Sequence, residues 1–454
     1  MTLPDTDDTI VAQATPPGTA ALAVVRLSGP RAFAAAAALL GPAAARPRHR
    51  SARLLAVRDG GRLVDRAVAV FHRAPASYTG EDTVEICCHG SPFVVRTILN
   101  LAVRAGARPA GPGEFTLRAF LNGKLDLAQA EAVGALIEAG SAAAHRAALT
   151  QVEGGISAEV RSIRAGLVSL LAELEARLDD SYEEQPALEL KDFARRAAAA
   201  RERTLRLAAG FEAGRGIKEG LRVVITGAPN SGKSSLLNAL LGYDRALVSG
   251  EAGTTRDTLE AELEIDGFRV LFTDTAGLNA GPSSPLEREG MRRAAAALRR
   301  ADAVVLVRDG SIKESPSDRR ALAEAGAAGA ARVIAVLNKA DLPARRRPKA
   351  GELRVSARTG EGLGRLRSLL VAGQKKVFRD GSQAVVTSAR HFAALSEAAG
   401  QLAALPAVLK GPNPGTELAA EHLRAALAAL ASILGETAPE EVLAEVFSSF
   451  CVGK

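Results

Sequence analysis

A glycine-rich loop in the middle of the chain has the residue types and spacing needed to hold phosphate groups. Residues 227–234 read Gly-Ala-Pro-Asn-Ser-Gly-Lys-Ser and lie between an apolar run and a helical pattern. Glycines let backbone N–H groups converge on phosphate oxygens, and the start of a helix adds a positive dipole end. We expect Lys233 to contact the β- and γ-phosphates of a nucleotide and the hydroxyl of Ser234 to bind Mg²⁺. The loop therefore predicts a nucleotide site between a strand and a helix.

Further polar segments follow in the order that a GTP-hydrolysing domain requires. Residues 253–257 offer a threonine hydroxyl to Mg²⁺, and an expected strand ends in Asp274, whose carboxylate can hold the water shell of the metal. A second expected strand ends in Asn-Lys-Ala-Asp, where Asp341 can accept hydrogen bonds from both N1–H and N2–H₂ of guanine. Residues 356–358, Ser-Ala-Arg, would close the base pocket. Together these segments predict a GTPase domain.

The group that orients the attacking water is not where Ras-like GTPases carry it. Leu278 follows Gly277 at the position of a water-orienting glutamine, and an apolar side chain cannot orient water. Glu287 is the first candidate for this role and Glu289 the second, although the sequence alone favours a solvated carboxylate on a helix surface. Asn230 of the phosphate loop can coordinate a monovalent cation, which would neutralise transition-state charge as an arginine finger does.

Length and composition describe a folded protein of more than one domain. The chain has 454 residues, 47% hydrophobic and 24% charged, which is more than one hydrophobic core usually serves. There is no apolar stretch long enough to cross a membrane, the first residues are acidic rather than those of a signal peptide, and the three cysteines form no disulfide framework. We therefore expect a cytoplasmic protein. The formal net charge of +7 permits a nucleic-acid partner, and equally a solvated basic surface.

The pattern along the chain divides it into four segments. Residues 1–120 mix short β-type runs with Gly/Pro turns, 121–218 are helical, 219–376 alternate strands with helices, and 377–454 are helical again. Helix faces are marked by the recurring residues Leu167, Leu170, Leu171, Leu174 and Leu178, and by Leu423, Leu427, Leu430 and Leu434 before a C-cap glycine, Gly435. The predicted fold class is multidomain α/β, with an N-terminal α+β domain, a helical domain and an inserted Ras-like P-loop GTPase domain.

Segments near the two ends of the chain resemble the TrmE (MnmE) family of tRNA-modification GTPases, and the resemblance extends over nearly the whole length. These segments are more specific than the GTPase motifs, which many families share. They are Asp8-Thr9-Ile10 with Ala14-Thr15-Pro16-Pro17-Gly18, Tyr78-Thr79-Gly80-Glu81-Asp82, Gly113-Glu114-Phe115, Arg118-Ala119-Phe120-Leu121-Asn122-Gly123-Lys124-Leu125-Asp126 and Phe450-Cys451-Val452-Gly453-Lys454. Two departures are Thr-Ala-Ala at 19–21, where the family usually has Arg-Gly-Gly, and Asp-Ser-Tyr at 180–182, where it has Asp-Phe-Pro.

The resemblance implies a role in modifying tRNA. Members of the family act with the flavoprotein MnmG and install an aminomethyl-type group at C5 of the wobble uridine. A reduced folate, 5,10-methylene- or 5-formyl-tetrahydrofolate, supplies one carbon, and GTP hydrolysis is needed. The resemblance also implies a homodimer built by the N-terminal domains, and a GTPase that K⁺ stimulates by ordering a loop so that two GTPase domains meet.

The resemblance further implies a site for each ligand. Folate contacts fall on Arg26, Glu85, Lys124 and Lys454, whose charges suit a glutamate tail and pterin N–H groups. The implied K⁺ ligands are Asn230, Ser249, Glu251 and Thr254, the Mg²⁺ ligands are Ser234 and Thr255, and the catalytic residues are Glu287 and Lys233. The full nucleotide-binding set is Asn230, Ser231, Gly232, Lys233, Ser234, Ser235, Ser249, Gly250, Glu251, Ala252, Gly253, Thr254, Thr255, Asp274, Thr275, Ala276, Gly277, Asn338, Lys339, Asp341, Ser356, Ala357 and Arg358.

Three features outside these sites each have two interpretations. Cys451 is either a reactive thiol near the folate or the tRNA base, or an inert cysteine near a chain end. His89 beside Cys87 and Cys88 suggests metal ligands, but the sequence has no further Cys/His cluster to complete a set, so we interpret it as structural. The basic run 345–349 can contact tRNA phosphates or form a solvated loop.

Two other classes of protein share parts of this pattern. A ribosome-assembly GTPase would carry an RNA-binding module, such as a KH domain with a GxxG loop, where this chain has Ala- and Leu-rich helices. A GTP-gated scaffold without catalysis is disfavoured by the presence of Ser234, Asp274 and Glu287.

Overall fold

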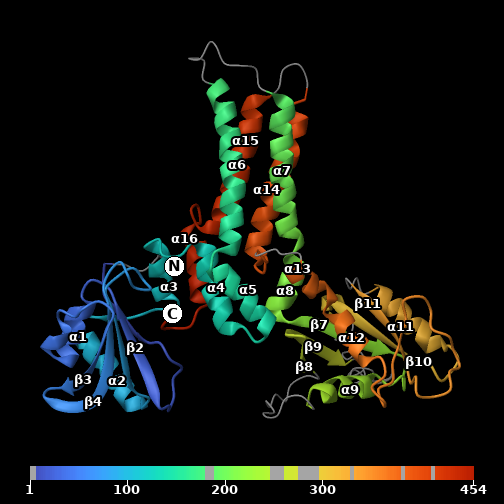
Figure 1. Cartoon of the computed structure of the whole chain (residues 1–454), viewed down its shortest axis with the longest axis horizontal. Helices are drawn as coiled ribbons and strands as arrows, with labels where there is room; N and C mark the ends of the chain where they lie inside the picture. The colour runs from blue at the N-terminus through green and yellow to red at the C-terminus, as the bar shows by residue number, and fades with distance from the viewer. Residues whose placement is uncertain are drawn as a thin grey trace, which may run out of the picture. The chain divides into compact units, whose positions relative to one another are not determined.

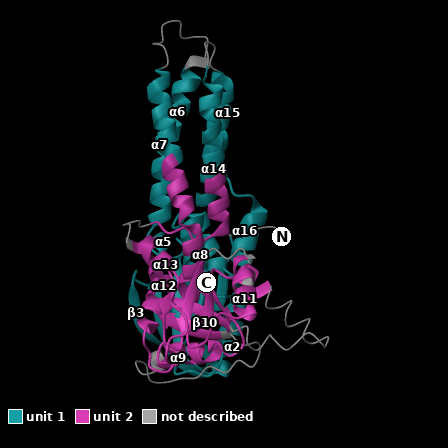
Figure 2. Ribbon diagram, turned by 90° about the vertical axis from the view of Figure 1, so that its right-hand side faces the viewer, with its two compact units in different colours: residues 1–134, 151–201, 397–454 teal, residues 135–150, 202–396 magenta. Residues whose placement is uncertain are grey.

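The computed structural model describes residues 7–178, 189–245, 260–274, 296–327, 332–379, 384–410 and 415–454 (Figure 1). The chain forms two compact units, coloured separately in Figure 2. The first contains residues 1–134, 151–201 and 397–454, and the second contains 135–150 and 202–396. Each unit is thus assembled from segments that are distant in sequence. The bounds of the four predicted segments stay a prediction. In the described ranges, no helix is long and apolar enough to span a membrane.

The N-terminal part of the first unit is a six-stranded sheet with helices packed on it. The strands are β1 (Ile10–Gln13), β2 (Leu22–Ser28), β3 (Ser51–Asp59), β4 (Arg62–His72), β5 (Thr83–His89) and β6 (Arg108–Pro109), in the order β3-β4-β5-β2-β1-β6. Helices α1 (Ala32–Leu40) and α2 (Pro92–Arg104), with the short 3₁₀ helix η1 (Pro42–Ala44), bury their apolar residues against the sheet. Strand β4 alternates buried Ala67, Ala69 and Phe71 with more accessible neighbours, because successive side chains of a strand point to opposite faces.

Long helices make up much of the rest of the first unit, although the end of α7 and the start of α14 belong to the second unit. Helix α6 (Gly155–Leu178) packs along α15 (Thr416–Leu434), and in both Figures 1 and 2 they run beside α7 (Leu190–Ala209) and α14 (Ala389–Val408). Leu167, Leu170 and Leu174 are buried, as the leucine spacing predicts. Helix α15 ends at Gly435, whose φ of 84° confirms the predicted C-cap. The shorter helices α3 (Glu114–Leu121), α4 (Leu127–Glu138) and α16 (Glu440–Ser448) share a small core around Leu117, Leu127 and Phe447.

A second six-stranded sheet forms the centre of the second unit. Its strands are β7 (Leu221–Gly227), β8 (Glu260–Ile265), β9 (Phe268–Asp274), β10 (Ala303–Asp309), β11 (Val333–Asn338) and β12 (Leu353–Arg354), in the order β12-β11-β10-β7-β9-β8. All neighbours are parallel except β8, which forms an antiparallel hairpin with β9. Strand β10 is buried along its whole length, as expected for a central parallel strand.

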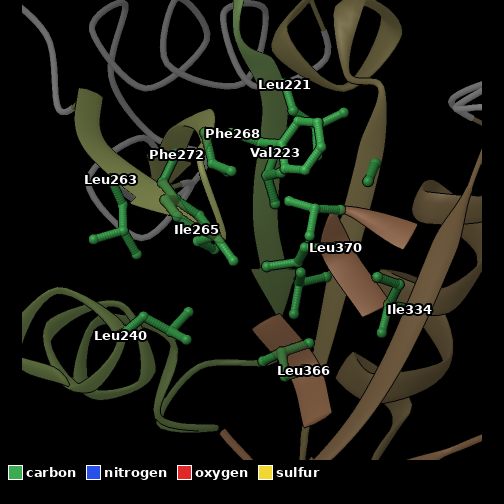
Figure 3. Close-up of a cluster of buried hydrophobic side chains, with 14 of the residues drawn as sticks. Leu221, Val223, Leu240, Leu263, Ile265, Phe268, Phe272, Ile334, Leu366 and Leu370 are labelled. Carbon is green, nitrogen blue, oxygen red and sulfur yellow. The ribbon is translucent and has the colours of Figure 1, made fainter. Parts of the chain in front are cut away.

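Helices cover this sheet and complete its core. They are α5 (Ala142–Val152), α8 (Phe211–Glu219), α9 (Lys233–Arg245), α11 (Pro316–Ala327), α12 (Leu363–Leu370) and α13 (Ala372–Arg379). Figure 3 shows Leu240 of α9 and Leu366 and Leu370 of α12 among the side chains of the strands. The strand-and-helix alternation confirms the predicted fold class, because parallel strands require a crossover between them.

Candidate functional site

The phosphate loop joins the end of β7 to the start of α9, as the motif predicts. At Gly227 the backbone has φ of 151°, and a Cβ there would lie 2.1 Å from the carbonyl oxygen of Val307. The side chain of Lys233 is buried and its Nζ donates to the carbonyl oxygens of Gly227 and Ala228, at 3.2 and 3.1 Å. Glycine is therefore required where the loop passes β10, and the lysine ammonium is aimed into the loop.

Asn338 connects three predicted loops of the site. It ends β11 and is 2% exposed. Its Nδ2 donates to the carbonyl oxygen of Ser231 at 3.0 Å, and its Oδ1 accepts from the backbone N–H of Ala357 at 3.2 Å. Gly232 has φ of 91° and leaves room for this amide, since a Cβ would lie 2.3 Å from Nδ2. The side chain of Asn338 thus connects the phosphate loop with residues 356–358, and Asn338 itself begins the base loop, residues 338–341.

Asp341 is held as an ionised acceptor at the base pocket. The Oγ of Ser356 donates to its Oδ1 at 2.5 Å, and Nε of Arg358 lies 2.8 Å from its Oδ2. The pKa of Asp341 is lowered, chiefly by the hydrogen bond from Ser356 and with a further contribution from the charge of Arg358. A carboxylate has about four lone-pair directions, so these two partners leave capacity for two N–H donors of a base.

Asp309 is a member of the site that the motifs did not identify. It ends β10, and its Oδ2 forms a 2.6 Å ion pair with Nζ of Lys339. Burial raises the pKa of the Asp309 carboxyl, but hydrogen bonds from Lys339 and Ser311 outweigh it, so the pKa is lowered overall. The sequence could have indicated Asp309 by its position at the carboxyl end of an expected strand. The carboxyl ends of parallel strands lie at the edge of the sheet where ligands bind.

Other predicted nucleotide residues have simpler placements. Asn230 lies in the phosphate loop with φ of 60°, and Ser234 and Ser235 are exposed in the first turn of α9. This turn suits a hydroxyl ligand of Mg²⁺, because the N–H groups at the start of a helix face the phosphates. The following predicted residues lie outside the described residues: Ser249, Gly250, Glu251, Ala252, Gly253, Thr254, Thr255, Thr275, Ala276, Gly277 and Glu287. Asp274 ends β9, but its side chain is not described.

Three of the four predicted folate residues meet in the first unit. Arg26 and Glu85 are cross-strand partners on β2 and β5 and form a 2.7 Å ion pair. Nη1 of Arg26 also donates to the carbonyl oxygen of Gly453 at 3.4 Å, and the guanidinium lies 5.6 Å from the ring centre of Phe115. Burial and the positive charge of Arg26 lower the pKa of the Lys454 ammonium. An anion next to these two cations would therefore be bound favourably.

Lys124, the fourth residue of that set, has a different partner. Its Nζ donates to the carbonyl oxygen of Pro75 at 3.1 Å, and its stem packs against Gly80. Gly80 belongs to the segment that also carries Tyr78, whose ring lies 5.9 Å from the guanidinium of Arg26. Lys124 is thus connected to the Arg26 group through one short loop.

The C-terminal tail, residues 450–454, packs against the N-terminal part of the same unit. Val452 forms an isolated β-bridge with Pro112, and the carbonyl oxygen of Lys454 accepts from the N–H of Phe115 at 3.2 Å. Gly453 has φ of 98°, and a Cβ there would lie 2.2 Å from the carbonyl oxygen of Gln13. Cys451 is exposed. These contacts position Lys454, so the terminal motif has a structural role.

Several residues of the specific N-terminal segments form a buried ion network. Arg118 is fully buried and pairs with Asp8, with Glu81 at 3.2 Å and with Glu114 at 3.1 Å. Arg108 adds ion pairs of 2.6 Å to Asp8 and to Glu114. Because a buried charge is costly without partners, these residues are mutually dependent. They hold α3 and the N-terminal strand together.

His89 also has a structural partner. Its Nδ1 lies 2.7 Å from Oδ1 of Asp65, whose other oxygen accepts from the His89 N–H at 2.9 Å. Cys88 is buried, and its thiol donates to the carbonyl oxygen of Ala23. Burial raises the pKa of the Cys88 thiol to about 11. These contacts agree with the structural interpretation of this segment.

The sheet order, the phosphate loop after β7 and the base loop after β11 define a P-loop GTPase domain. The family model described as MnmE helical domain matches residues 127–451, and the one described as GTP-binding protein TrmE N-terminus matches residues 9–124. A tRNA modification GTPase MnmE of Xanthomonas campestris is 43% identical over 98% of this chain and 99% of the relative, and that of Akkermansia muciniphila is 41% identical over 99% and 100%. The chain belongs to the MnmE family of tRNA modification GTPases.

A solved structure of Era, in complex with MgGDPNP and a fragment of 16S ribosomal RNA, matches a smaller part of the chain. It covers 33% of this chain and 55% of its own, at 25% identity. The TM-score of 0.26 is too low to support a conclusion about this chain.

Proposed function

We propose that the chain hydrolyses GTP as the GTPase component of wobble-uridine C5 modification in tRNA, acting with a flavoprotein partner, MnmG, and a reduced folate. Asn338 carries the proposal, because it joins the loop of Lys233 to the base loop of Asp341 in one site. A single ligand that presents both phosphates and guanine donors would occupy both parts. Family membership supports tRNA as the substrate.

In the proposed hydrolysis, water attacks the γ-phosphorus in line with the leaving phosphate. Lys233 would neutralise charge on the β- and γ-phosphates, and Mg²⁺, held by Ser234 and Thr255, would supply further positive charge. We assign the placing of the water to Glu287. These residues would stabilise charge or position the reactants and form no covalent bond, because phosphoryl transfer needs little covalent help from the protein.

K⁺ is proposed as the second cation of the site. Asn230 supports this, because its backbone has a left-handed conformation and its side chain is exposed at the loop. The other proposed ligands are Ser249, Glu251 and Thr254. A monovalent cation there would add charge beside the phosphates without an arginine from another protein.

The proposed folate site uses the group around Arg26. Arg26 and Lys454 would bind the carboxylates of a glutamate tail, while Glu85 would accept from N–H groups of the pterin. Lys124 would reach the same ligand from the neighbouring loop. The aromatic rings of Phe115 and Tyr78 beside Arg26 offer an apolar wall for a flat heterocycle. Cys451, exposed in the tail, stays a candidate thiol of this region.

A homodimer through the N-terminal domain is supported by an apolar row on its sheet. Leu54 and Val68 face each other on β3 and β4 and are 65% and 40% exposed. Val68 is paired with Cys87, and Cys87 with Val24, so the row continues across four strands. An exposed apolar face of this kind is more typical of a protein interface than of a solvated surface.

The decisive experiment is GTP turnover by the purified protein in KCl and in NaCl at equal ionic strength. We expect at least a tenfold higher rate in K⁺, corresponding to about 1.4 kcal/mol of transition-state stabilisation. Asn230→Ala should remove most of the difference between the salts, whereas Lys233→Ala should abolish turnover in both. Equal rates of the unaltered protein in KCl and NaCl would refute the potassium mechanism. Absence of turnover in both would refute the GTPase assignment.

A further inference from the structure

The loop that contains the basic run 345–349 carries more positive charge than its surroundings neutralise. We call residues 345–354 the basic loop. Its exposed arginines are Arg345, Arg347 and Arg354, and none of the three forms an ion pair within the part of the chain that the structure describes. The basic loop follows β11 and ends with the two residues of β12, Leu353 and Arg354, at the edge of the sheet opposite β8.

The acidic residues around the basic loop already have other partners. Asp318 pairs with Arg346 at 2.7 Å, and Glu352 pairs with Arg308 at 3.0 Å. Glu314 lies 3.5 Å from Arg308 and 3.8 Å from Lys349. Three arginine charges are therefore left over, and an external anion is the natural group to neutralise them.

The backbone of the basic loop is held in place rather than loosely solvated. The N–H of Arg345 donates to the carbonyl oxygen of Gly310 at 2.9 Å. The side chain of Arg346 is 9% exposed and donates to the carbonyl oxygens of Ile312 and Lys313, at 3.0 and 3.1 Å. Lys349 and Glu352 are joined by two further hydrogen bonds. Because these contacts fix the loop before any ligand binds, binding of an anion would cost the loop little conformational entropy.

A cavity of about 200 Å³ opens beside the loop, and Arg346, Arg347 and Arg354 line it. Nη1 of Arg346 is buried and has no acceptor among the described residues. Asn338, Lys339 and Ala340 also line the cavity, so it adjoins the segment at 338–341, whereas Asp341 and residues 356–358 do not line it. Planar guanidinium groups that converge on one cavity are suited to phosphate oxygens.

We propose that the basic loop and its cavity bind a backbone phosphate of the RNA substrate. This proposal rests on the proposed function in tRNA modification, which supplies a polyanion as the partner. Arg347 and Arg354 contact the phosphate in the cavity, and Arg345 contacts a neighbouring phosphate of the same strand. Contacts of this kind position an RNA without reading its bases.

The test measures binding of a fluorescently labelled tRNA transcript to the full chain loaded with GDP, by anisotropy, over a series of KCl concentrations. The variant is R345A/R347A/R354A. The matched control is R299A/R300A/R365A, which removes the same charge from exposed arginines elsewhere in the second unit. Basal GTP turnover and the thermal unfolding midpoint of both variants verify that the GTPase domain is folded.

We expect the loop variant to bind tRNA at least tenfold more weakly, with the slope of log K against log salt reduced in magnitude by about 1.4–1.8, since each of the two phosphate contacts contributes about 0.7–0.9. The control should stay within about twofold of the unaltered protein. Equal weakening in both variants would show a general charge effect and overturn the site. Unchanged binding in the loop variant, or no tRNA binding by the unaltered protein, would overturn it as well.

A free phosphate ion is the alternative occupant of the cavity. Inorganic phosphate is added at constant ionic strength, and it should displace tRNA only weakly if a backbone phosphate is the true ligand. Phosphate binding that depends on Arg347 and Arg354 while tRNA binding does not would overturn the assignment to RNA. The proposed function is decided separately, by the mass of the wobble nucleoside after incubation of tRNA with the chain, the flavoprotein, folate and GTP.

Discussion

Glu114 illustrates how a single residue of a family-specific segment can be structural. It is 2% exposed, and its carboxylate accepts from the N–H of Gly111 at 2.7 Å as well as from Arg108 and Arg118. Burial raises the pKa of the Glu114 carboxyl, but the hydrogen bonds from Arg108, Gly111 and Arg118 outweigh it and the pKa is lowered overall. The ionised form is therefore the one that stabilises the fold.

We predict that Glu114→Gln lowers the free energy of unfolding of the first unit by about 3 kcal/mol at pH 7, because it removes one of the carboxylates that neutralise the buried guanidinium of Arg118. A carboxyl with a lowered folded-state pKa stabilises the protein above its unfolded value of about 4.3. That contribution is lost as the pH falls from there through the lower folded pKa. Thermal unfolding from pH 7 to pH 3 should show the variant and the unaltered protein converging below about pH 4. Glu397→Gln, at an exposed site, should follow the unaltered protein throughout; a pH-independent gap for Glu114→Gln would contradict the electrostatic explanation.

At the scale of elements, two helical glycines have opposite requirements. Gly214 of α8 passes so close to the segment after residue 384 that a Cβ would lie 2.1 Å from the carbonyl oxygen of Val386. Gly166 of α6 is exposed, and a Cβ there would meet nothing within 4 Å. Helix propensity alone favours alanine at both positions, so the tertiary contact decides the difference.

We predict that Gly214→Ala lowers the free energy of unfolding by at least about 2 kcal/mol, because α8 or the backbone at Val386 must move. Gly166→Ala should raise it by up to about 1 kcal/mol, since it removes only the entropic cost of a helical glycine. Calorimetric unfolding of the two variants and the unaltered protein checks both signs. A Gly214→Ala protein as stable as the unaltered one would mean that the close approach is easily relieved.

At the scale of the whole molecule, the C-terminal tail (residues 450–454) meets the N-terminal sheet in the first unit. Gly453, one residue before the end, lies against Gln13 near the beginning, and the tail is bridged to Pro112. The predicted folate group needs this closure, because Lys454 joins Arg26 and Glu85 only when the tail is seated. GTP hydrolysis uses residues of the second unit.

We predict that Gly453→Ala weakens binding of a reduced folate at least tenfold and leaves basal GTP turnover within about twofold of the unaltered rate, because the added methyl collides with the backbone of Gln13. Isothermal titration with 5-formyl-tetrahydrofolate measures the first effect. Gly41→Ala is the matched control: Gly41 also has positive φ, at 87°, but a Cβ there meets nothing within 4 Å. Folate binding that is equally weak in both variants would point to backbone strain in general rather than to the seating of the tail.

Much of the GTPase site was predictable from short stretches of sequence. The loop at 227–234 and the segment at 338–341 each work through backbone geometry and side chains that are close in sequence, so their spacing predicts their chemistry. The leucine faces of α6 and α15 were predictable for the same reason, since a helical period is a local property. Asp309 was not predicted, because its ion pair is with Lys339, which follows the neighbouring strand β11.

The sequence by itself determined the classes of chemistry, namely phosphate binding, guanine recognition and the family to which the end segments belong. Only the tertiary structure decided which charged residues are buried in ion pairs and which lie at a proposed ligand site. Arg118 and Arg346 are buried in ion pairs, whereas Arg26 pairs with Glu85 and also contacts the tail, and Arg347 lies exposed beside a cavity. The physical reason is that the energy of a charge depends on its burial and its partners. Those partners come from segments that are distant in sequence and are brought together only by folding.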